Sequence, residues 1–181
     1  YQSGGYTDDL TWAAAWLYIA TGEQEYLDKA LSYVPVEELG GHHTHCWDDV
    51  TYGAAIKLAQ ITKDPRYIEK VEVNLDWWQP DGGLTYTPGG LAYLSNWGVL
   101  RYATTAAFIA FVWSDDDTVC SPEKQDAYRT FAERMVNYAL GDNPRNSSYV
   151  VGFGENAAFR PHHRTTHGSW ISMLDVPPFH R

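Results

Sequence analysis

Cysteine, basic residues and long apolar runs are all scarce in this chain of 181 residues, and each shortage narrows its class. The two cysteines, Cys46 and Cys120, are too few and too far apart for a disulfide framework or a paired-cysteine metal site. Lys and Arg total 13 against 23 Asp and Glu, which gives a net charge of −10 and disfavours nucleic acid and acidic membranes as partners. The most apolar stretch, Tyr102 to Trp113, is shorter than the roughly 20 residues that span a bilayer, so we expect no membrane span.

Apolar residues make up 44% of the chain and aromatic residues 15%, enough to build the core of a folded globular protein. The chain begins at Tyr1 rather than at a methionine, and it ends at Arg181 without a helix-ending device. We therefore expect it to be an internal segment of a longer protein.

A repeat of about 40 residues organises the first half of the chain. Residues 8–14 match 48–54 in character, and residues 21–29 match 62–70. Each unit starts with acidic residues, where Thr7 or Asp48 is expected to cap a helix. This period is typical of a helical hairpin.

Each unit combines two kinds of helix, the first apolar nearly all round and the second amphipathic. A third unit follows, with an apolar helix from Trp97 to Trp113 and an amphipathic helix that opens at Ser121 and stops at Gly141. The apolar helices, including the first, are expected to be buried in an inner layer, and the amphipathic helices to be half-buried in an outer layer. This alternation predicts an all-α fold in concentric layers. Residues 83–87 are expected to form a short strand or hairpin.

Three long loops, 35–47, 78–96 and 144–167, separate these elements and are expected to carry the site. The last one contains His162 and Arg164, two residues apart. An imidazole beside a guanidinium offers directed donors for sugar hydroxyls or for charge on a leaving group. The alternative is that both side chains cap helix carbonyls or pair with surface acids.

Residues 148–164 resemble the histidine-arginine signature of glycoside hydrolase family 9, the cellulase family with an (α/α)6 barrel. The matching positions are Ser148, Val150, Val151, Gly154, Asn156, Pro161, His162 and Arg164. Further similarity, in the family's order, covers residues 3–21, 47–53, 87–91, 97–103 and 139–144. The resemblance implies that residues 1–181 form about half of one barrel, truncated at both ends.

Family members are inverting β-1,4-glucanases, in which one aspartate activates water and one glutamate protonates the leaving oxygen. Neither family motif for these carboxylates occurs in this sequence. The resemblance therefore implies hydrolysis of cellulose or related glucans by a longer enzyme, with no catalytic residue in this chain and an inactive isolated fragment. Glu155 and Asp175 are not assigned as catalysts.

The resemblance also implies substrate-binding residues, since His162 and Arg164 match those that hold the sugar around the cleavage point. Trp97, Arg101 and Tyr102 match a group that lines glucose subsites, where an indole offers an apolar face to a pyranose ring. The alternatives are a core position for Trp97 and a structural ion pair for Arg101.

Carboxylates gather at the starts of the first two repeat units, as hard cations such as calcium require. Family members hold calcium with a serine-glycine segment, an aspartate-glutamate pair and a later aspartate. By resemblance the metal residues are Gly4, Asp8, Asp9 and Asp48, although Gly4 replaces a usual serine and Asp9 a usual glutamate. Simple helix capping by Asp8 and Asp48 is the alternative.

Residues 42–46 hold His42, His43, His45 and Cys46, which are ligand types for zinc. Their spacing matches no zinc knuckle, and adjacent histidines do not readily point at one ion. An exposed loop that contacts sugar is the favoured interpretation.

Two other functions remain open: a non-catalytic carbohydrate-binding helical toroid and a helical-repeat interaction module. The latter is disfavoured because such modules repeat their exposed positions instead of carrying unique Gly and His loops. The preferred reading is a secreted cellulase segment whose partners are a β-1,4-glucan and the remainder of the same domain.

Overall fold

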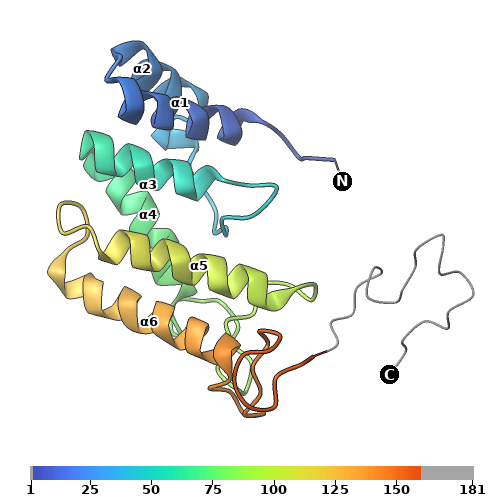
Figure 1. Cartoon of the computed structure of the whole chain (residues 1–181). Coiled ribbons are helices and arrows are strands. Elements are labelled where there is room, and N and C mark those ends of the chain that lie inside the picture. The colour runs from blue at the N-terminus through green and yellow to red at the C-terminus, as the bar shows by residue number, and fades with distance from the viewer. Residues whose placement is uncertain (1, 160–181) are drawn as a thin grey trace, which may run out of the picture. The chain divides into compact units, whose positions relative to one another are not determined.

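The computed structural model describes residues 2–159 and divides the chain into two compact units, residues 1–136 and 137–181 (Figure 1). Within 2–159 the fold is helical, as predicted, and contains no strand beyond two isolated bridges. The helices are α1 (Thr7–Thr21), α2 (Gln24–Tyr33), the short 3-10 helix η1 (Val36–Glu38), α3 (Thr51–Thr62), α4 (Pro65–Trp78), α5 (Val99–Ser114) and α6 (Pro122–Leu140).

The predicted hairpins are confirmed, and the repeat extends to their turns. Gly22 directly follows α1 and Lys63 directly follows α3, and both are left-handed, with φ of 73° and 56°. Their amides donate to the carbonyls of Tyr18 and Ala59, which closes the last turn of each helix. Asp64 then caps α4 through the Arg66 amide, ahead of a proline at the first helical position.

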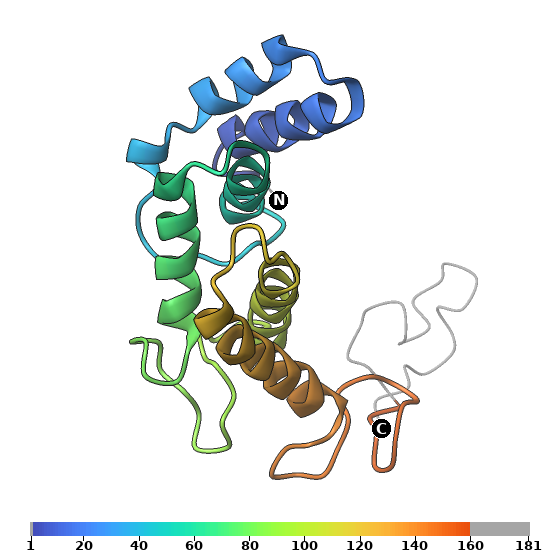
Figure 2. The ribbon, with the colours of Figure 1, turned by 90° about the vertical axis from the view of Figure 1, so that its left-hand side faces the viewer.

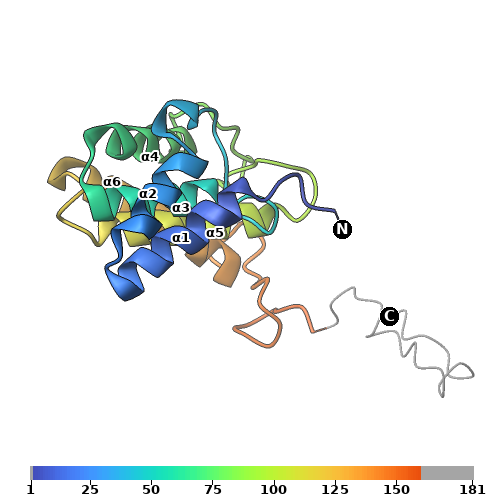
Figure 3. The ribbon, with the colours of Figure 1, turned by 90° about the horizontal axis from the view of Figure 1, so that it is seen from above.

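In the first unit, α1, α3 and α5 lie in one row with their N-terminal ends on the same side (Figures 1 and 2). Helices α2 and α4 lie behind this row, as the view from above shows (Figure 3). Helix α6 packs on α4, where Tyr128 donates a 2.7 Å hydrogen bond to Asp76 and Lys124 pairs with Glu72 and Asp76. The row and its backing helices correspond to the predicted inner and outer layers.

Burial of α1 is the one layer prediction that is wrong. Only Thr11, Ala14 and Ala15 of this helix are buried, whereas α3 is buried along most of its length. The large apolar side chains Leu10, Trp16, Leu17 and Ile19 are 40% to 47% exposed. The reason is that α1, within the described residues, packs mainly against α2 and α3, so the rest of its apolar surface has no neighbour.

Of the short strand or hairpin expected at 83–87, the structure has the hairpin, formed around a tight turn. Tyr86 bridges Ala92, and the amides of Thr87 and Tyr93 donate across to the carbonyls of Leu91 and Thr85. Gly90 closes the turn at φ 88°, a conformation that favours glycine.

The described part of the second unit, 137–159, contains the end of α6 and the loop that follows it. As predicted, α6 stops before Gly141, which has φ of 125°. The buried Asn143 donates to the carbonyls of Tyr138 and Ser147, and the Tyr138 and Tyr149 rings stack at 6.4 Å. These contacts fix the start of the loop onto the end of the helix.

Candidate functional site

Trp97 lies directly before α5 and is 80% exposed, which makes it the most accessible large apolar side chain among the described residues. A left-handed Gly98, with φ of 64°, joins it to the helix. The described structure therefore gives the core alternative no support. An indole presented in this way offers a free apolar face to a ligand.

Arg101 and Tyr102 form one unit in the first turn of α5. The Arg101 guanidinium carbon lies 4.4 Å from the centre of the Tyr102 ring, and the guanidinium also donates to the Tyr102 hydroxyl. No carboxylate of the described residues pairs with Arg101, so the ion-pair alternative has no support there. Stacking on the ring holds the guanidinium at the exposed start of α5 while leaving donors free.

The 42–46 loop is fastened to two helices, α4 and α5, by its backbone and by one buried threonine. Thr44 donates to the Tyr102 carbonyl at 3.3 Å. The His43 amide donates to Asn74 at 3.0 Å, and Trp78 donates to the His43 carbonyl at 3.1 Å. This loop is therefore part of the support beneath the start of α5.

The histidine side chains of this loop diverge. His42 stacks flat on Trp77 at 4.7 Å, His43 lies 3.3 Å from Asp49, and His45 contacts the Trp12 ring. Within residues 2–159 no three His, Cys, Asp or Glu side chains are placed to hold a metal ion. The described geometry gives the zinc interpretation of this loop no support.

His45 lines an apolar cavity of about 300 Å³ between α1, α3 and α5. Its Nδ1 atom is buried and has no partner in the described structure, and burial lowers the pKa of the imidazole. Gly53 makes room for the ring, because a Cβ at this position would lie 2.6 Å from His45 and 2.8 Å from Trp12.

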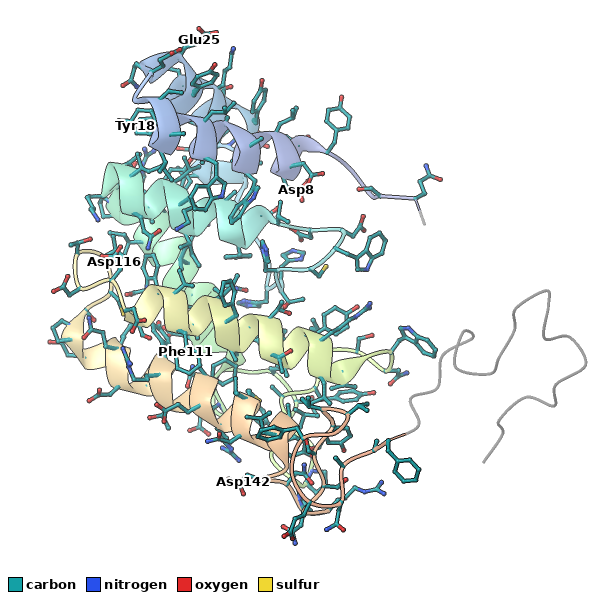
Figure 4. The ribbon with its side chains drawn as sticks, viewed as in Figure 1. Asp8, Tyr18, Glu25, Phe111, Asp116 and Asp142 are labelled. Carbon is teal, nitrogen blue, oxygen red and sulfur yellow. The ribbon has the colours of Figure 1, made fainter. Side chains whose placement is uncertain are left out.

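The starts of α1 and α3 are joined by reciprocal hydrogen bonds from backbone to carboxylate. The Gly4 amide donates to Asp48 at 2.7 Å, and the Val50 amide donates to Asp8 at 2.8 Å. Neither helix has a side-chain cap, so the capping expected of Thr7, Asp8 and Asp48 is wrong. Asp8 lies at the N-terminal end of α1, whereas Tyr18 lies towards the other end of this helix (Figure 4).

Three of the four predicted metal residues, Gly4, Asp8 and Asp48, thus lie where two segments meet. Asp9 is exposed and belongs to no three-carboxylate group in the described residues. Two carboxylates beside a backbone segment form a partial donor set for a hard cation.

His162, Arg164 and Asp175 lie outside the described residues. The described start of the signature forms a turn in which Ser148 is buried and accepts a hydrogen bond from the Val150 amide. Glu155 is exposed in this loop. Sequence reasoning missed the buried anchors Thr44 and Asn74, because isolated polar residues carry no periodic signal.

Comparisons with known proteins match this arrangement to one family. The model of glycosyl hydrolase family 9 matches residues 1–180. The chain therefore belongs to glycosyl hydrolase family 9, and its helical hairpins are part of the (α/α)6 barrel of that family.

The chain is 50% identical to endoglucanase A of Bacillus pumilus over 98% of its own length, and 42% identical to endoglucanase B of Cellulomonas fimi. It spans only 28% and 18% of these two relatives. The crystal structure of endoglucanase CelQ from Clostridium thermocellum complexed with cellotriose matches 98% of this chain and 31% of its own, at 48% identity and a TM-score of 0.86. The cellulase Cel9M of C. cellulolyticum matches at 38% identity, with coverages of 99% and 41% and a TM-score of 0.83.

Proposed function

We propose that this chain is a substrate-binding part of a glycoside hydrolase that cleaves β-1,4-glucosidic bonds in cellulose or related glucans with inversion. The observation that carries the proposal is the exposed Trp97 indole at the start of α5. It stands in a chain whose sequence is 50% identical to that of an endoglucanase. The complete domain, meaning this chain together with the remaining segments of the family barrel, performs the hydrolysis.

The roles of the residues follow from their chemistry. The Trp97 indole packs against the apolar face of a glucosyl ring, and Arg101 and Tyr102 bond its hydroxyls from the first turn of α5. His162 and Arg164 hold the sugar on either side of the scissile bond. The base and acid carboxylates belong to the segments that complete the barrel, where inversion requires room for a water between them.

Calcium is proposed as a structural ion at the junction of α1 and α3. Asp8, Asp48 and a backbone carbonyl of the Gly4 segment would hold it, with Asp9 adding negative charge nearby. The support for this is the meeting of these segments through the Gly4–Asp48 and Val50–Asp8 hydrogen bonds. When bound, such an ion supplies cross-linking charge and no catalytic step.

We also propose that the enzyme is secreted, because an insoluble polymer cannot enter a cell and must be cut outside it. None of the described helices is both long and apolar enough to cross a bilayer.

Trp97→Ala tests the function in the complete domain. Wild type should release reducing sugars of inverted configuration from a soluble cello-oligosaccharide, as followed by proton NMR. Trp97→Ala should raise KM about tenfold or more by removing the stacking face. Trp97→Phe is the matched control, which keeps an aromatic face and should retain most of the affinity.

Two results would contradict the proposal. Equal KM values for Trp97→Ala and wild type would show that the indole does not bind the substrate. Binding to cellulose without release of sugar, by a correctly folded complete domain, would favour the non-catalytic toroid.

A further inference from the structure

A second pocket lies between α6 and the hairpin that follows α4. Its lining does not include Trp97, Arg101 or Tyr102. Its volume is about 310 Å³, at the lower end of the range for small-molecule sites, which is about 300–1000 Å³. The lining combines polar and apolar residues, chiefly Gln79, Pro80, Tyr86, Asp126, Thr130 and Arg134.

The wall formed by Tyr86 and Arg134 is held in place by the hairpin. The Tyr86 hydroxyl donates to the Trp78 carbonyl, and burial raises the pKa of this tyrosine to about 12, so it stays a neutral donor. The Arg134 guanidinium carbon lies 6.0 Å from the centre of the Tyr86 ring. Gly90 lies against the same guanidinium, and a Cβ at this position would be only 2.5 Å from Arg134 Nη2. The glycine-rich stretch 87–91 thus shapes a wall of this pocket.

The α6 side of the pocket is one stripe of this helix, to which Arg134 also belongs. Asp126, Thr130 and Arg134 follow each other at four-residue intervals, so they share a helix face. Within residues 2–159 neither the Asp126 carboxylate nor the Arg134 guanidinium has an ion-pair partner, whereas the nearby Arg129 is paired with Asp115. The Asp126 carboxylate and the Arg134 guanidinium therefore line one cavity, and neither forms an ion pair within the part of the chain that the structure describes.

The geometry points to an accessory glucan-binding site in this pocket. A neutral polyol can donate to Asp126 and accept from Arg134 at once, which an anion cannot do because Asp126 would repel it. The apolar face of a pyranose ring matches Pro80 and the Tyr86 ring. The pocket takes one or two β-glucosyl units. The choice of a glucan as the ligand rests on the proposed function.

The test uses the complete domain and thio-linked cellotetraose, a cello-oligosaccharide that is not hydrolysed. Calorimetry should find two sites per molecule in wild type. Arg134→Ala and Asp126→Ala should each weaken one of them about tenfold or more, the effect of losing a charged hydrogen bond. Both variants should keep wild-type kcat/KM on soluble cellotetraose and slow the attack on insoluble cellulose. Arg129→Ala, a matched arginine on the same helix, should change none of these values.

A single site in wild type, or two sites of unchanged affinity in Arg134→Ala, would overturn the inference. So would a second site that prefers an oligosaccharide of uronic acids over thio-linked cellotetraose. A complete domain that hydrolyses no glucan but binds at an Arg134-dependent site would contradict the proposed function while supporting the accessory site.

Discussion

The Asp8 carboxylate accepts a 2.8 Å hydrogen bond from the Val50 amide, which links the start of α1 to the start of α3. The Gly4 amide donates to Asp48 in the opposite direction, so each segment supplies one carboxylate and one amide. Charge-assisted bonds of this kind are stronger than neutral ones and leave the other carboxylate oxygens available. The contacts link the two repeat units directly, and the remaining carboxylate oxygens are the ligands that the proposed calcium ion would use.

Asp8→Ala should lower the stability of the complete domain and its response to calcium. The loss of the bond to Val50 should cost about 1 kcal/mol, because this carboxylate is only partly buried. In wild type, millimolar calcium should raise Tm relative to EDTA, since the ion binds only the folded state. The increase should be much smaller in Asp8→Ala, as measured by scanning calorimetry.

Asp117→Ala is the control for this experiment, because Asp117 is exposed in the turn between α5 and α6. It should retain both the stability and the calcium response of wild type. Identical wild-type melting curves in EDTA and in calcium would remove the proposed ion.

Gly53→Ala should destabilise the complete domain, although alanine favours helices over glycine by about 1 kcal/mol. The added Cβ would lie 2.6 Å from the His45 ring and 2.8 Å from Trp12, and overpacking of this kind costs about 1–3 kcal/mol. We expect a net loss of about 1 kcal/mol in urea unfolding. The double variant Gly53→Ala with His45→Ala should recover part of it, since the smaller side chain removes one clash.

Gly5→Ala is the matched control, because a Cβ at Gly5 meets nothing within 4 Å. If Gly53→Ala proves as stable as Gly5→Ala, the ring of His45 does not occupy the described position.

His45 should make the stability of the domain fall in mild acid. Burial lowers the pKa of this imidazole in the folded state, so the unfolded chain binds the proton more readily. The free energy of unfolding should therefore decrease as the pH falls through the ordinary histidine value of about 6.5 towards the lower folded value. Tm measured from pH 8 to pH 5 should decline less in His45→Phe than in wild type.

His42→Phe provides the comparison, because His42 is exposed and stacked on Trp77 rather than buried in the cavity. Its Tm profile should follow that of wild type. Equal slopes for His45→Phe and wild type would mean that the imidazole titrates normally.

Sequence patterns predicted the helical hairpins because their signals are local and periodic. The repeat placed Gly22 and Lys63 at equivalent turns, and both adopt the same left-handed conformation. Burial of α1 was mispredicted because an apolar surface shows only that a helix needs neighbours, not that the chain supplies them. The exposed Leu10 and Leu17 mark surface that the remaining barrel segments are expected to cover.

The candidate site was predictable to the extent that it follows one helix start. Arg101 and Tyr102 lie in the first turn of α5, and Trp97 lies two residues before that helix, so all three are near its start. The reciprocal bonds of Asp8 and Asp48 join segments about 40 residues apart, and helix-capping rules, which consider one helix at a time, assigned them wrongly. The Arg134 pocket had no signal of its own, because it depends on a distant hairpin touching α6.

We expect His162 and Arg164 to position the sugar rather than to transfer the catalytic proton. A guanidinium cannot lose its proton near neutral pH, so Arg164 can only donate hydrogen bonds and charge, whereas His162 can titrate. Alanine at either position in the complete domain should remove roughly 2 to 4 kcal/mol of transition-state stabilisation, which lowers kcat/KM about 30- to 1000-fold. Both limbs of the pH–rate profile should stay in place, because the two carboxylates of the completing segments set them. The disappearance of one limb in His162→Ala would identify the imidazole as the proton donor. Unchanged kinetics in both variants would assign the pair to a structural role and would contradict much of the proposed sugar-binding site.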